Sequence, residues 1–442
     1  MKKCIIIVVC LLLTFGSYSQ EGFHLSGNKQ AKISFQLINN LIFIPVKVNG
    51  VSMTFLLDTG VEETILFSLE ETDTVPFFNV NKVKLRGLGG DESIEALSSS
   101  ENRIEISKNF ADAKHTILIV LDEEINFSSS VGIPVNGILG YHFFRNSCVK
   151  IDYVKKHLHI YNTNSKAIKK LKNKYRAVPI SIEGNKPYLI GNFKLNGSND
   201  FEGKLLIDIG NSDALWLFEK QSELIKIPAS NFEDFLGRGF SGDIHGKRAK
   251  INQFEMATFQ FNKPYVAFPD YNSIKNVKMV SKRVGSVGGE ILKRFNVVFD
   301  YQNNLLLLKK NEKFSNSFTY NMSGLEINHA GKQWVPETMP ITTFVTTVGD
   351  ESHYQKKENP IKFNFVLKPI FKIVNVREDS PGATAGLKKD DVIVSISRKP
   401  ASTYTLQSIN ELLKSEDGKK ILFEVNRNGK YVKTTLQLKS IL

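Results

Sequence analysis

The chain has 442 residues, too many for a single hydrophobic core, and at about 100 to 200 residues per domain it should divide into about two to four units. Lysine and arginine number 58 against 45 aspartates and glutamates, a formal net charge of +13 at pH 7. This excess is spread along the chain, without a basic helix interleaved with aromatic residues, so nucleic-acid binding is not expected.

The N-terminal segment has the three parts of a secretory signal peptide. Lys2 and Lys3 precede an apolar run over 4–13, and small residues follow it. We expect residues 1–19 to be removed, which would give an exported protein, periplasmic or secreted, from a bacterial cell. No later apolar run reaches membrane-spanning length, so no transmembrane segment is expected after removal of the signal.

Cysteine and histidine usage argues against thiol and metal chemistry. Loss of the signal would leave Cys148 as the only cysteine, and its apolar context indicates a buried small hydrophobe. The closest histidine pair, His157 and His159, has no carboxylate or cysteine at ligand spacing. We therefore expect neither a disulfide, nor a metal, nor an organic cofactor.

The first predicted β-hairpin ends on an aspartate. An apolar strand over 40–48 reaches the Asn-Gly pair at 49–50, a strong hairpin signal, and the returning strand ends on Asp58-Thr59-Gly60. Short strands rich in Ile, Val, Phe and Leu, with Gly and Asn turns, continue through this region. The pattern predicts a mainly β fold that delivers a carboxylate to a tight turn.

The same pattern returns about 150 residues later. A strand over 188–195 reaches Asn-Gly at 196–197, and its return strand ends on Asp208-Ile209-Gly210. Two further pairs of segments keep the same order and spacing. They are 87–90 with 237–240, both glycine-rich, and 137–140 with 285–288, both of the form Gly-x-x-Gly. Correspondence at three places predicts two homologous lobes, at 31–163 and 176–311.

These features resemble the pepsin and retropepsin superfamily of aspartic peptidases over most of residues 31–311. In that family each lobe offers one Asp-Thr/Ser-Gly loop, and the loops meet about a pseudo-twofold axis. Two carboxylates only about 3 Å apart cannot both ionise, so they share a proton. One acts as general base on a water while the other donates to the peptide carbonyl oxygen. The resemblance implies two acid-protease-like β-barrel lobes with Asp58 and Asp208 as the catalytic pair.

The resemblance also assigns supporting roles. The active-site loop support would be Thr59, Gly60, Ile209, Gly210, Asn211, Gly140 and Gly288, and the flap over substrate would be Gly87, Gly89 and Gly90. The second lobe departs from the family pattern. Ile209 lacks the hydroxyl that Thr59 brings to the lobe interface, and Ser286 interrupts the apolar pair before Gly288. Asn211 stands where the family has a small residue, from which it could hydrogen-bond Asp208.

A competing pattern overlaps the second turn. Gly210-Asn211-Ser212 resembles the nucleophile turn of trypsin-like peptidases. In those enzymes two glycines follow the serine and shape the oxyanion hole, whereas Asp213-Ala214 follow here. A partner histidine at a suitable strand end is also not apparent, so the serine mechanism is disfavoured.

A different pattern begins beyond Lys310. The stretch 380–393 carries Ser-Pro-x-x-x-Ala-Gly-Leu followed by Asp-Val-Ile, and resembles a PDZ domain, here at 316–442 with a long insertion at 332–367 predicted as an extended loop. Such a domain pairs a peptide with an edge strand and holds its carboxylate with backbone N–H groups. By resemblance the peptide-binding residues would be Ser323, Gly324, Leu325, Glu326 and Ile327, with a helix at 406–413 as the other wall.

The expected function is that of an exported aspartic endopeptidase that cuts peptide or protein substrates, with a PDZ groove for substrate or partner peptides. The alternative is a non-catalytic protein that keeps the lobes as a scaffold and binds peptides through the PDZ groove. Ile209 is the feature that keeps this alternative open.

Overall fold

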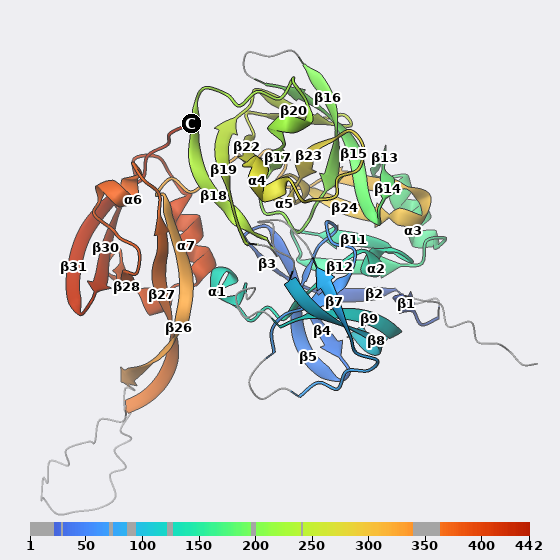
Figure 1. The fold of residues 1–442 in the computed structure, drawn as a ribbon, viewed down its shortest axis with the longest axis horizontal. Helices are drawn as coiled ribbons and strands as arrows, with labels where there is room; N and C mark the ends of the chain where they lie inside the picture. The colour runs from blue at the N-terminus through green and yellow to red at the C-terminus, as the bar shows by residue number, and fades with distance from the viewer. Residues whose placement is uncertain are drawn as a thin grey trace, which may run out of the picture.

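The computed structural model describes residues 22–27, 30–69, 74–85, 94–121, 127–195, 200–239, 242–338 and 363–442. Strands dominate these ranges, so the predicted mainly β fold class is confirmed. Figure 1 shows two neighbouring β lobes with a separate module beside them. The expected signal peptide lies outside the described residues. Within them, no helix combines the length and apolar character that a membrane crossing requires.

The first lobe is one twisted sheet with strand order β1-β9-β6-β10-β5-β4-β8-β7 and β3 beside β4. The predicted hairpin is formed by β4 and β5, which turn at Asn49 and Gly50, both at positive φ. Its elements are β1 (His24–Leu25), β3 (Gln36–Ile38), β4 (Leu41–Val48), β5 (Val51–Leu57), β6 (Thr64–Leu66), β7 (Asn81–Leu85), β8 (Ile94–Ser107), β9 (Phe110–Val120) and β10 (Gly137–Leu139), with helices α1 (Ser128–Val131) and α2 (Tyr141–Phe144).

The second lobe repeats this topology in the order β18-β19-β22-β17-β23-β16-β15-β20-β21, with β14 beside β15. β23 runs parallel to β16 and antiparallel to β17, as β10 does to β5 and β6. Its elements are β14 (Ser181–Glu183), β15 (Lys186–Lys194), β16 (Phe201–Ile207), β17 (Leu215–Leu217), η2 (Glu219–Gln221), β18 (Asn231–Gly239), β19 (Gly242–Lys250), β20 (Gln253–Met256), β21 (Phe259–Asn262), β22 (Tyr265–Pro269), α4 (Tyr271–Ile274), β23 (Arg283–Val287) and α5 (Gly289–Leu292).

A third sheet joins the lobes in the order β13-β25-β24-β11-β12-β2. β11 from the first half pairs antiparallel with β24 from the second, with Val149 opposite Phe299. Cys148 on β11 is buried against apolar side chains, as its sequence context predicts. The elements are β2 (Ala31–Ser34), β11 (Cys148–Asp152), β12 (His157–Tyr161), α3 (Lys166–Lys172), β13 (Arg176–Pro179), β24 (Phe295–Asp300), η3 (Tyr301–Asn303) and β25 (Leu305–Lys310).

The C-terminal module has its own sheet, β26-β27-β28-β30-β31 with β29 beside β28, and its own hydrophobic core. Its elements are β26 (Leu325–Thr338), β27 (Phe363–Val376), α6 (Pro381–Thr384), β28 (Val392–Ile396), β29 (Lys399–Pro400), η4 (Ala401–Thr403), α7 (Leu406–Leu413), β30 (Lys420–Arg427) and β31 (Lys430–Gln437). Leu406, Ile409 and Leu413 turn one face of α7 into that core, and the Thr405 side chain caps its first turn.

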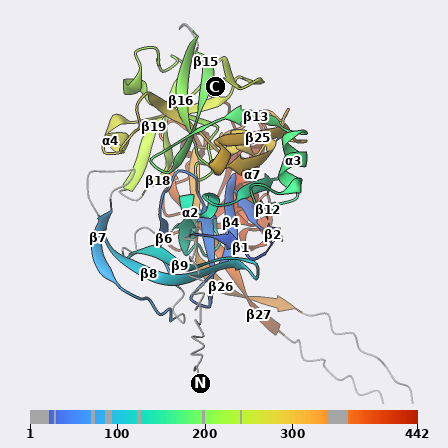
Figure 2. The same cartoon turned by 90° about the vertical axis from the view of Figure 1, so that its right-hand side faces the viewer.

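The predicted loop at 332–367 is partly wrong. Residues 332–338 and 363–369 continue the paired strands β26 and β27 as a long hairpin, which Figure 2 shows extending away from the rest of the chain. Trp334, Phe365 and Leu367 on it are exposed, so its strands lack the buried face whose alternation would have marked them in the sequence. Residues 339–362 lie outside the described ranges.

Candidate active site

Asp58 and Asp208 each follow the last residue of a strand and are held by a neighbouring parallel strand. The N–H of Asp58 donates to the Leu139 carbonyl at 3.0 Å, and the N–H of Asp208 donates to the Val287 carbonyl at 2.9 Å. The apolar sequences of β5, β10, β16 and β23 bury these strands, so both turns begin on a rigid base. Duplicated topology thus delivers two carboxyl groups in the same way.

The two glycines of the turns allow the carboxyl groups to meet. The Gly60 N–H donates to Asp58 Oδ1 at 2.6 Å, and the Gly210 N–H donates to Asp208 Oδ1 at 3.1 Å. A Cβ atom on Gly210 would lie 2.1 Å from Asp58 Cγ, so only glycine permits the second turn to come this close. The carboxyl groups of Asp58 and Asp208 are in hydrogen-bonding contact with each other.

Burial of this pair raises the pKa of both carboxyl groups. Desolvation, followed by the charge of Asp208, raises the pKa of Asp58 well above its usual value. Desolvation also raises the pKa of Asp208, but the positive charge of Arg283 opposes that rise. Two adjacent desolvated carboxyl groups hold one proton between them, so the arrangement can act as a combined acid and base.

The hydroxyl of Thr59 links the two turns. It donates to the Ile207 carbonyl at 2.6 Å and accepts from the Ile209 N–H at 3.1 Å. Ile209 is fully buried in the core and has no hydroxyl with which to return this interaction. At these turns a side-chain hydroxyl of the first lobe bonds to the second lobe, but no equivalent hydroxyl returns from the second lobe to the first.

The side chain of Asn211 does not reach the Asp208 carboxyl, so that expected hydrogen bond is a wrong prediction. Its amide nitrogen donates to Ser286 Oγ at 3.3 Å, and its Oδ1 accepts from the Asp213 N–H at 2.9 Å. Ser286, which interrupts the apolar pattern of β23, is thus the partner of the unusual Asn211. The pair ties the second turn to the strand that supports it.

Gly140 and Gly288 lie against the backbone of the two turns. A Cβ atom at Gly140 would lie 2.4 Å from the Val61 carbonyl oxygen, and one at Gly288 would lie 2.4 Å from the Asp213 carbonyl oxygen. Both positions exclude any side chain. The equivalent contact in each lobe explains why Gly-x-x-Gly recurs in the sequence.

Two asparagines tie the lobes together across the site, and sequence reasoning missed both. Asn40, between β3 and β4, donates to the Ser212 carbonyl at 2.8 Å and to Glu290 Oε2 at 2.9 Å. Asn185, between β14 and β15, donates to Glu62 Oε1 at 2.5 Å. Each asparagine stands just before the first strand of its repeated hairpin, a shared position that could have marked them.

Two cations beside the aspartates were also missed, because they lie outside the turn motifs. Lys186 opens β15 and Arg283 opens β23, and both line the same cavity as the aspartates. Within the described part of the chain neither forms an ion pair with a carboxylate. Desolvation, and then the charge of Arg283, lowers the pKa of Lys186. The site therefore carries positive charge close to its acidic pair.

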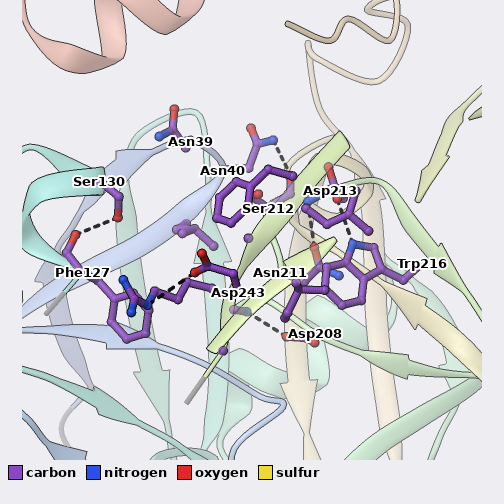
Figure 3. A pocket seen from close by; sticks show the side chains of 18 of the residues that line it. Asn39, Asn40, Phe127, Ser130, Asp208, Asn211, Ser212, Asp213, Trp216 and Asp243 are labelled. Carbon is purple, nitrogen blue, oxygen red and sulfur yellow. Dashed lines mark hydrogen bonds and ion pairs between the residues drawn. The ribbon is translucent and has the colours of Figure 1, made fainter. Parts of the chain in front are cut away.

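The aspartates open into a cavity of about 1410 Å³ between the lobes and the C-terminal module. This exceeds the roughly 300–1,000 Å³ of a small-molecule pocket, so it suits a stretch of polymer. Figure 3 shows residues of both lobes around it, with Phe127 and Ser130 on the side opposite Asp213 and Trp216.

The proposed flap residues, Gly87, Gly89 and Gly90, lie outside the described residues. They join β7 and β8, which pair antiparallel up to Leu85 opposite Ile94. Leu85 lines the cavity, as do residues 233–239 and 243–245 of the β18–β19 hairpin in the second lobe. The described part of β7 and the β18–β19 hairpin therefore both border the site.

The predicted peptide-binding residues of the module form a turn and the start of a strand. Ser323 is buried, Gly324 has a φ of 73°, and β26 begins at Leu325. Leu325 and Ile327 are buried in the module core, and both also line the cavity that holds the aspartates. Desolvation, then the charges of two aspartates, raises the pKa of Glu326 to about 7.

The competing nucleophiles and metals find no support in the described ranges. The hydroxyl of Ser212 has no histidine partner there. An Asp112–His115–Thr64 chain does exist, with both contacts of the His115 ring at 2.6 Å, but Thr64 is fully buried and beyond reach of substrate. In the same ranges no group of three or more His, Cys, Asp or Glu side chains is placed to hold a metal ion.

Comparison with known proteins adds two similarities. A family model described as "PDZ domain" matches residues 372–427, so the C-terminal module is a PDZ domain. The chain is also similar to the crystal structure of an aspartic proteinase from Irpex lacteus, with 11% sequence identity and a TM-score of 0.41, over 65% of this chain and 99% of that one. No curated protein sequence matches.

Proposed function

We propose that the protein is an exported aspartic endopeptidase, with Asp58 and Asp208 activating a water molecule. The observation that carries this proposal is the contact between two desolvated carboxyl groups, each delivered by the same strand and turn. The ionised carboxylate takes a proton from the water molecule while the water oxygen attacks the peptide carbonyl carbon. The other carboxyl donates its proton to the carbonyl oxygen, which gives a tetrahedral diol. As the diol collapses, the first carboxyl passes the proton from water to the leaving nitrogen, and the second takes a proton back from a diol hydroxyl.

The charges around the pair affect the pKa values of the two carboxyl groups unequally. The positive charges of Arg283 and Lys186 oppose the rise in the pKa of Asp208, whereas the pKa of Asp58 lies well above its usual value. These cations therefore favour the ionised form of the pair on the side of Asp208, and the acid and base roles belong to the pair as a whole. Both titrate together, so a pH profile reports the pair.

A peptidase assay tests the proposal. The purified protein is assayed on a mixed peptide library between about pH 3 and 8, beside Asp58→Asn and Asp208→Asn. General acid and base groups contribute about 10² to 10⁴ in rate, so each variant should lose at least about a hundredfold while keeping its melting temperature within a few degrees. Equal cleavage by all three proteins, or none by the wild type, rules out this function.

The PDZ domain supports a role in holding substrate or partner peptides, because such modules bind peptides by strand addition. The missing hydroxyl at Ile209, which leaves the Thr59 bonds without a counterpart, favours a second candidate. This candidate is a peptide-binding protein without catalysis. Saturable binding of library peptides by a wild-type protein that cuts none of them identifies that second function.

Export rests on the charged and apolar N-terminal segment. Expression of the full chain in a bacterium, followed by cell fractionation and N-terminal sequencing, should find a protein in the periplasm or medium that begins near Gln20. A cytoplasmic protein with an intact N-terminus contradicts export.

A further inference from the structure

The second-lobe wall of the catalytic cavity carries two cations beside the aspartates. Lys186, the first residue of β15, and Arg283, the first residue of β23, line the cavity together with Asp58 and Asp208. Arg283 is only 7% exposed and Lys186 is half-buried. Within the described ranges neither side chain has a carboxylate at ion-pair distance. Buried charges are normally paired, so two such cations in one wall favour the binding of an anion.

The guanidinium of Arg283 is held in place with its outer end free. Its Nε donates to the Gly285 carbonyl at 3.1 Å, and its central carbon lies 5.2 Å from the centre of the Phe218 ring. Its two terminal nitrogens have no acceptor among the described residues, and both keep some exposure to the cavity. A guanidinium gives its strongest pair of hydrogen bonds to a carboxylate, and these nitrogens are available for one.

The carboxylates already present do not offset the cost of burying these cations. The charges of Asp58, Asp208 and Glu62 favour the protonated form of Lys186, but desolvation and the charge of Arg283 outweigh them and lower its pKa. Desolvation likewise lowers the pKa of Arg283, against the charge of Asp208. The catalytic pair carries one negative charge when it shares a proton, and two cations face it. A carboxylate from the substrate would therefore be attracted to this wall in spite of the nearby aspartates.

The first lobe has apolar residues at the two equivalent positions. Leu41 opens β4 as Lys186 opens β15. Val135 stands two residues before the first glycine of its Gly-x-x-Gly segment, as Arg283 does in the second lobe. Leu41 and Val135 also line the cavity. The repeated fold delivers its aspartate in the first lobe without these charges, so the second-lobe cations are not required by that fold.

The cavity is large enough for the substrate chain to continue past the bond that is cut. It has a volume of about 1410 Å³ and extends beyond the aspartates to Gly324 of the PDZ domain and to Phe127 of the first lobe, which lies across the cavity from Asp208 (Figure 3). A carboxylate close to the aspartates would then belong to a side chain within the substrate and not to the end of its chain.

We infer that Lys186 and Arg283 form an anion subsite that binds the carboxylate of an aspartate or glutamate side chain next to the scissile bond of the substrate. This rests on the proposed peptidase function and specifies its substrate class. Lys186 and Arg283 are here specificity residues, because they hold a side chain of the substrate and take no part in the proton transfers.

Paired peptides test this inference. A peptide that the wild type cleaves is blocked at both ends and made with Glu or Gln at each position flanking the cut. The value of kcat/KM is measured at about pH 6, where glutamate is ionised, for the wild type, Lys186→Met, Lys186→Arg and Arg283→Gln. Lys226→Met, an exposed lysine outside the cavity, is the matched control. The Glu-to-Gln ratio is taken within each variant, so a general loss of activity through the catalytic pair cancels.

The wild type should prefer Glu to Gln by about ten- to a hundredfold at one flanking position, mainly through KM. Lys186→Met and Arg283→Gln should each lower this ratio at least about fivefold, because each leaves one cation of the subsite. Lys186→Arg should keep most of the ratio and Lys226→Met all of it. Below about pH 4 the ratio should fall toward one, since the glutamate side chain becomes neutral.

Two results overturn the inference and leave the peptidase standing. One is equal cleavage of the Glu and Gln peptides at every flanking position, and the other is a ratio that Lys186→Met leaves unchanged. Lys186 is half-buried, so this variant decides the test even if Arg283→Gln does not fold. A Gln peptide cut best when it is truncated to a free carboxylate beside the bond assigns the subsite to a chain end, which also overturns the inference. Absence of any cleavage overturns both the inference and the peptidase.

Discussion

Lys186 lies beside a carboxyl pair with which it shares no ion pair, and its charge bears on the acidity of both aspartates. It lowers the pKa of Asp208 and that of Asp58, against the larger effect of desolvation. The pair is active with one proton and inactive when both carboxyl groups are protonated. A nearby cation therefore extends the active form toward lower pH.

Lys186→Met should shift the acidic limb of the kcat/KM profile to higher pH. The pKa of the ionised member rises once the positive charge is gone, so the doubly protonated form persists to higher pH. Profiles of the wild type, Lys186→Met and the exposed-lysine control Lys226→Met are compared. A limb that stays in place, or moves to lower pH, contradicts this electrostatic role.

The sequence identified Asp58 more securely than the residues that tune it. Asp-Thr-Gly is a local motif, and its glycine and hydroxyl act within or just across one turn. Arg283 and Lys186 reach the site only because distant strands converge, and a single sequence carries no sign of that convergence. Asn211 shows a related limit, because its possible partners were visible but its choice of Ser286 was not.

At the scale of elements, the repeated hairpins could be predicted because turn chemistry and alternation act locally. β4 and β5 turn at the predicted Asn49-Gly50. The length of the β26–β27 hairpin was underestimated from the sequence, because its exposed strands lack the alternation of apolar and polar residues that marks a strand facing a core. Asn40 and Asn185, in the turns before β4 and β15, hydrogen-bond residues of the opposite lobe. Contacts between residues so far apart in the sequence leave no local pattern by which they could be predicted.

The hydrogen bond between Asn185 and Glu62, which links the two lobes, gives a prediction at this scale. Asn185→Asp keeps the size and tolerates the residue's φ of 61°, but places two carboxylates where a hydrogen bond of 2.5 Å stood. The free energy of unfolding should fall by about 1 to 3 kcal/mol. Chemical denaturation at pH 7 measures it.

A double variant provides the control for this hydrogen bond. Adding Glu62→Gln to Asn185→Asp restores a neutral donor opposite the new carboxylate, so most of the lost stability should return. If the double variant is no more stable than Asn185→Asp alone, the residues do not interact across the lobes.

At the scale of the whole molecule, the PDZ domain is packed onto the second lobe by apolar and charged contacts. Tyr265 of the lobe lies 4.8 Å, ring centre to ring centre, from Tyr320, and belongs to the module core. Asp234 bridges Arg248 of the lobe and Arg377 of the module. Sequence reasoning separated the two units by composition but had no means of docking them, since docking depends on surfaces assembled from several segments.

Asp234→Ala should loosen this docking. Arg377 would lose its ion-pair partner and Arg248 one of two, which for partly exposed groups should cost about 1 to 2 kcal/mol. Calorimetry should show the module unfolding at a lower temperature, separated from the lobes. Glu233→Ala, which removes an exposed pair with Lys247, is the matched control and should leave the trace unchanged. Identical traces for both variants contradict the bridging role.

The two lobes, whose strands β11 and β24 pair in one sheet, belong to a single polypeptide, and this has an evolutionary consequence. In a symmetric assembly of identical halves, every mutation is inherited twice and appears on both sides of the site. A fused pair escapes that constraint, so one copy can retain Thr59 while the other drifts to Ile209, and a lysine can arise at position 186 where the first copy has Leu41. Ancestral reconstruction of a single half, expressed as a homodimer, would show which asymmetries were acquired after fusion.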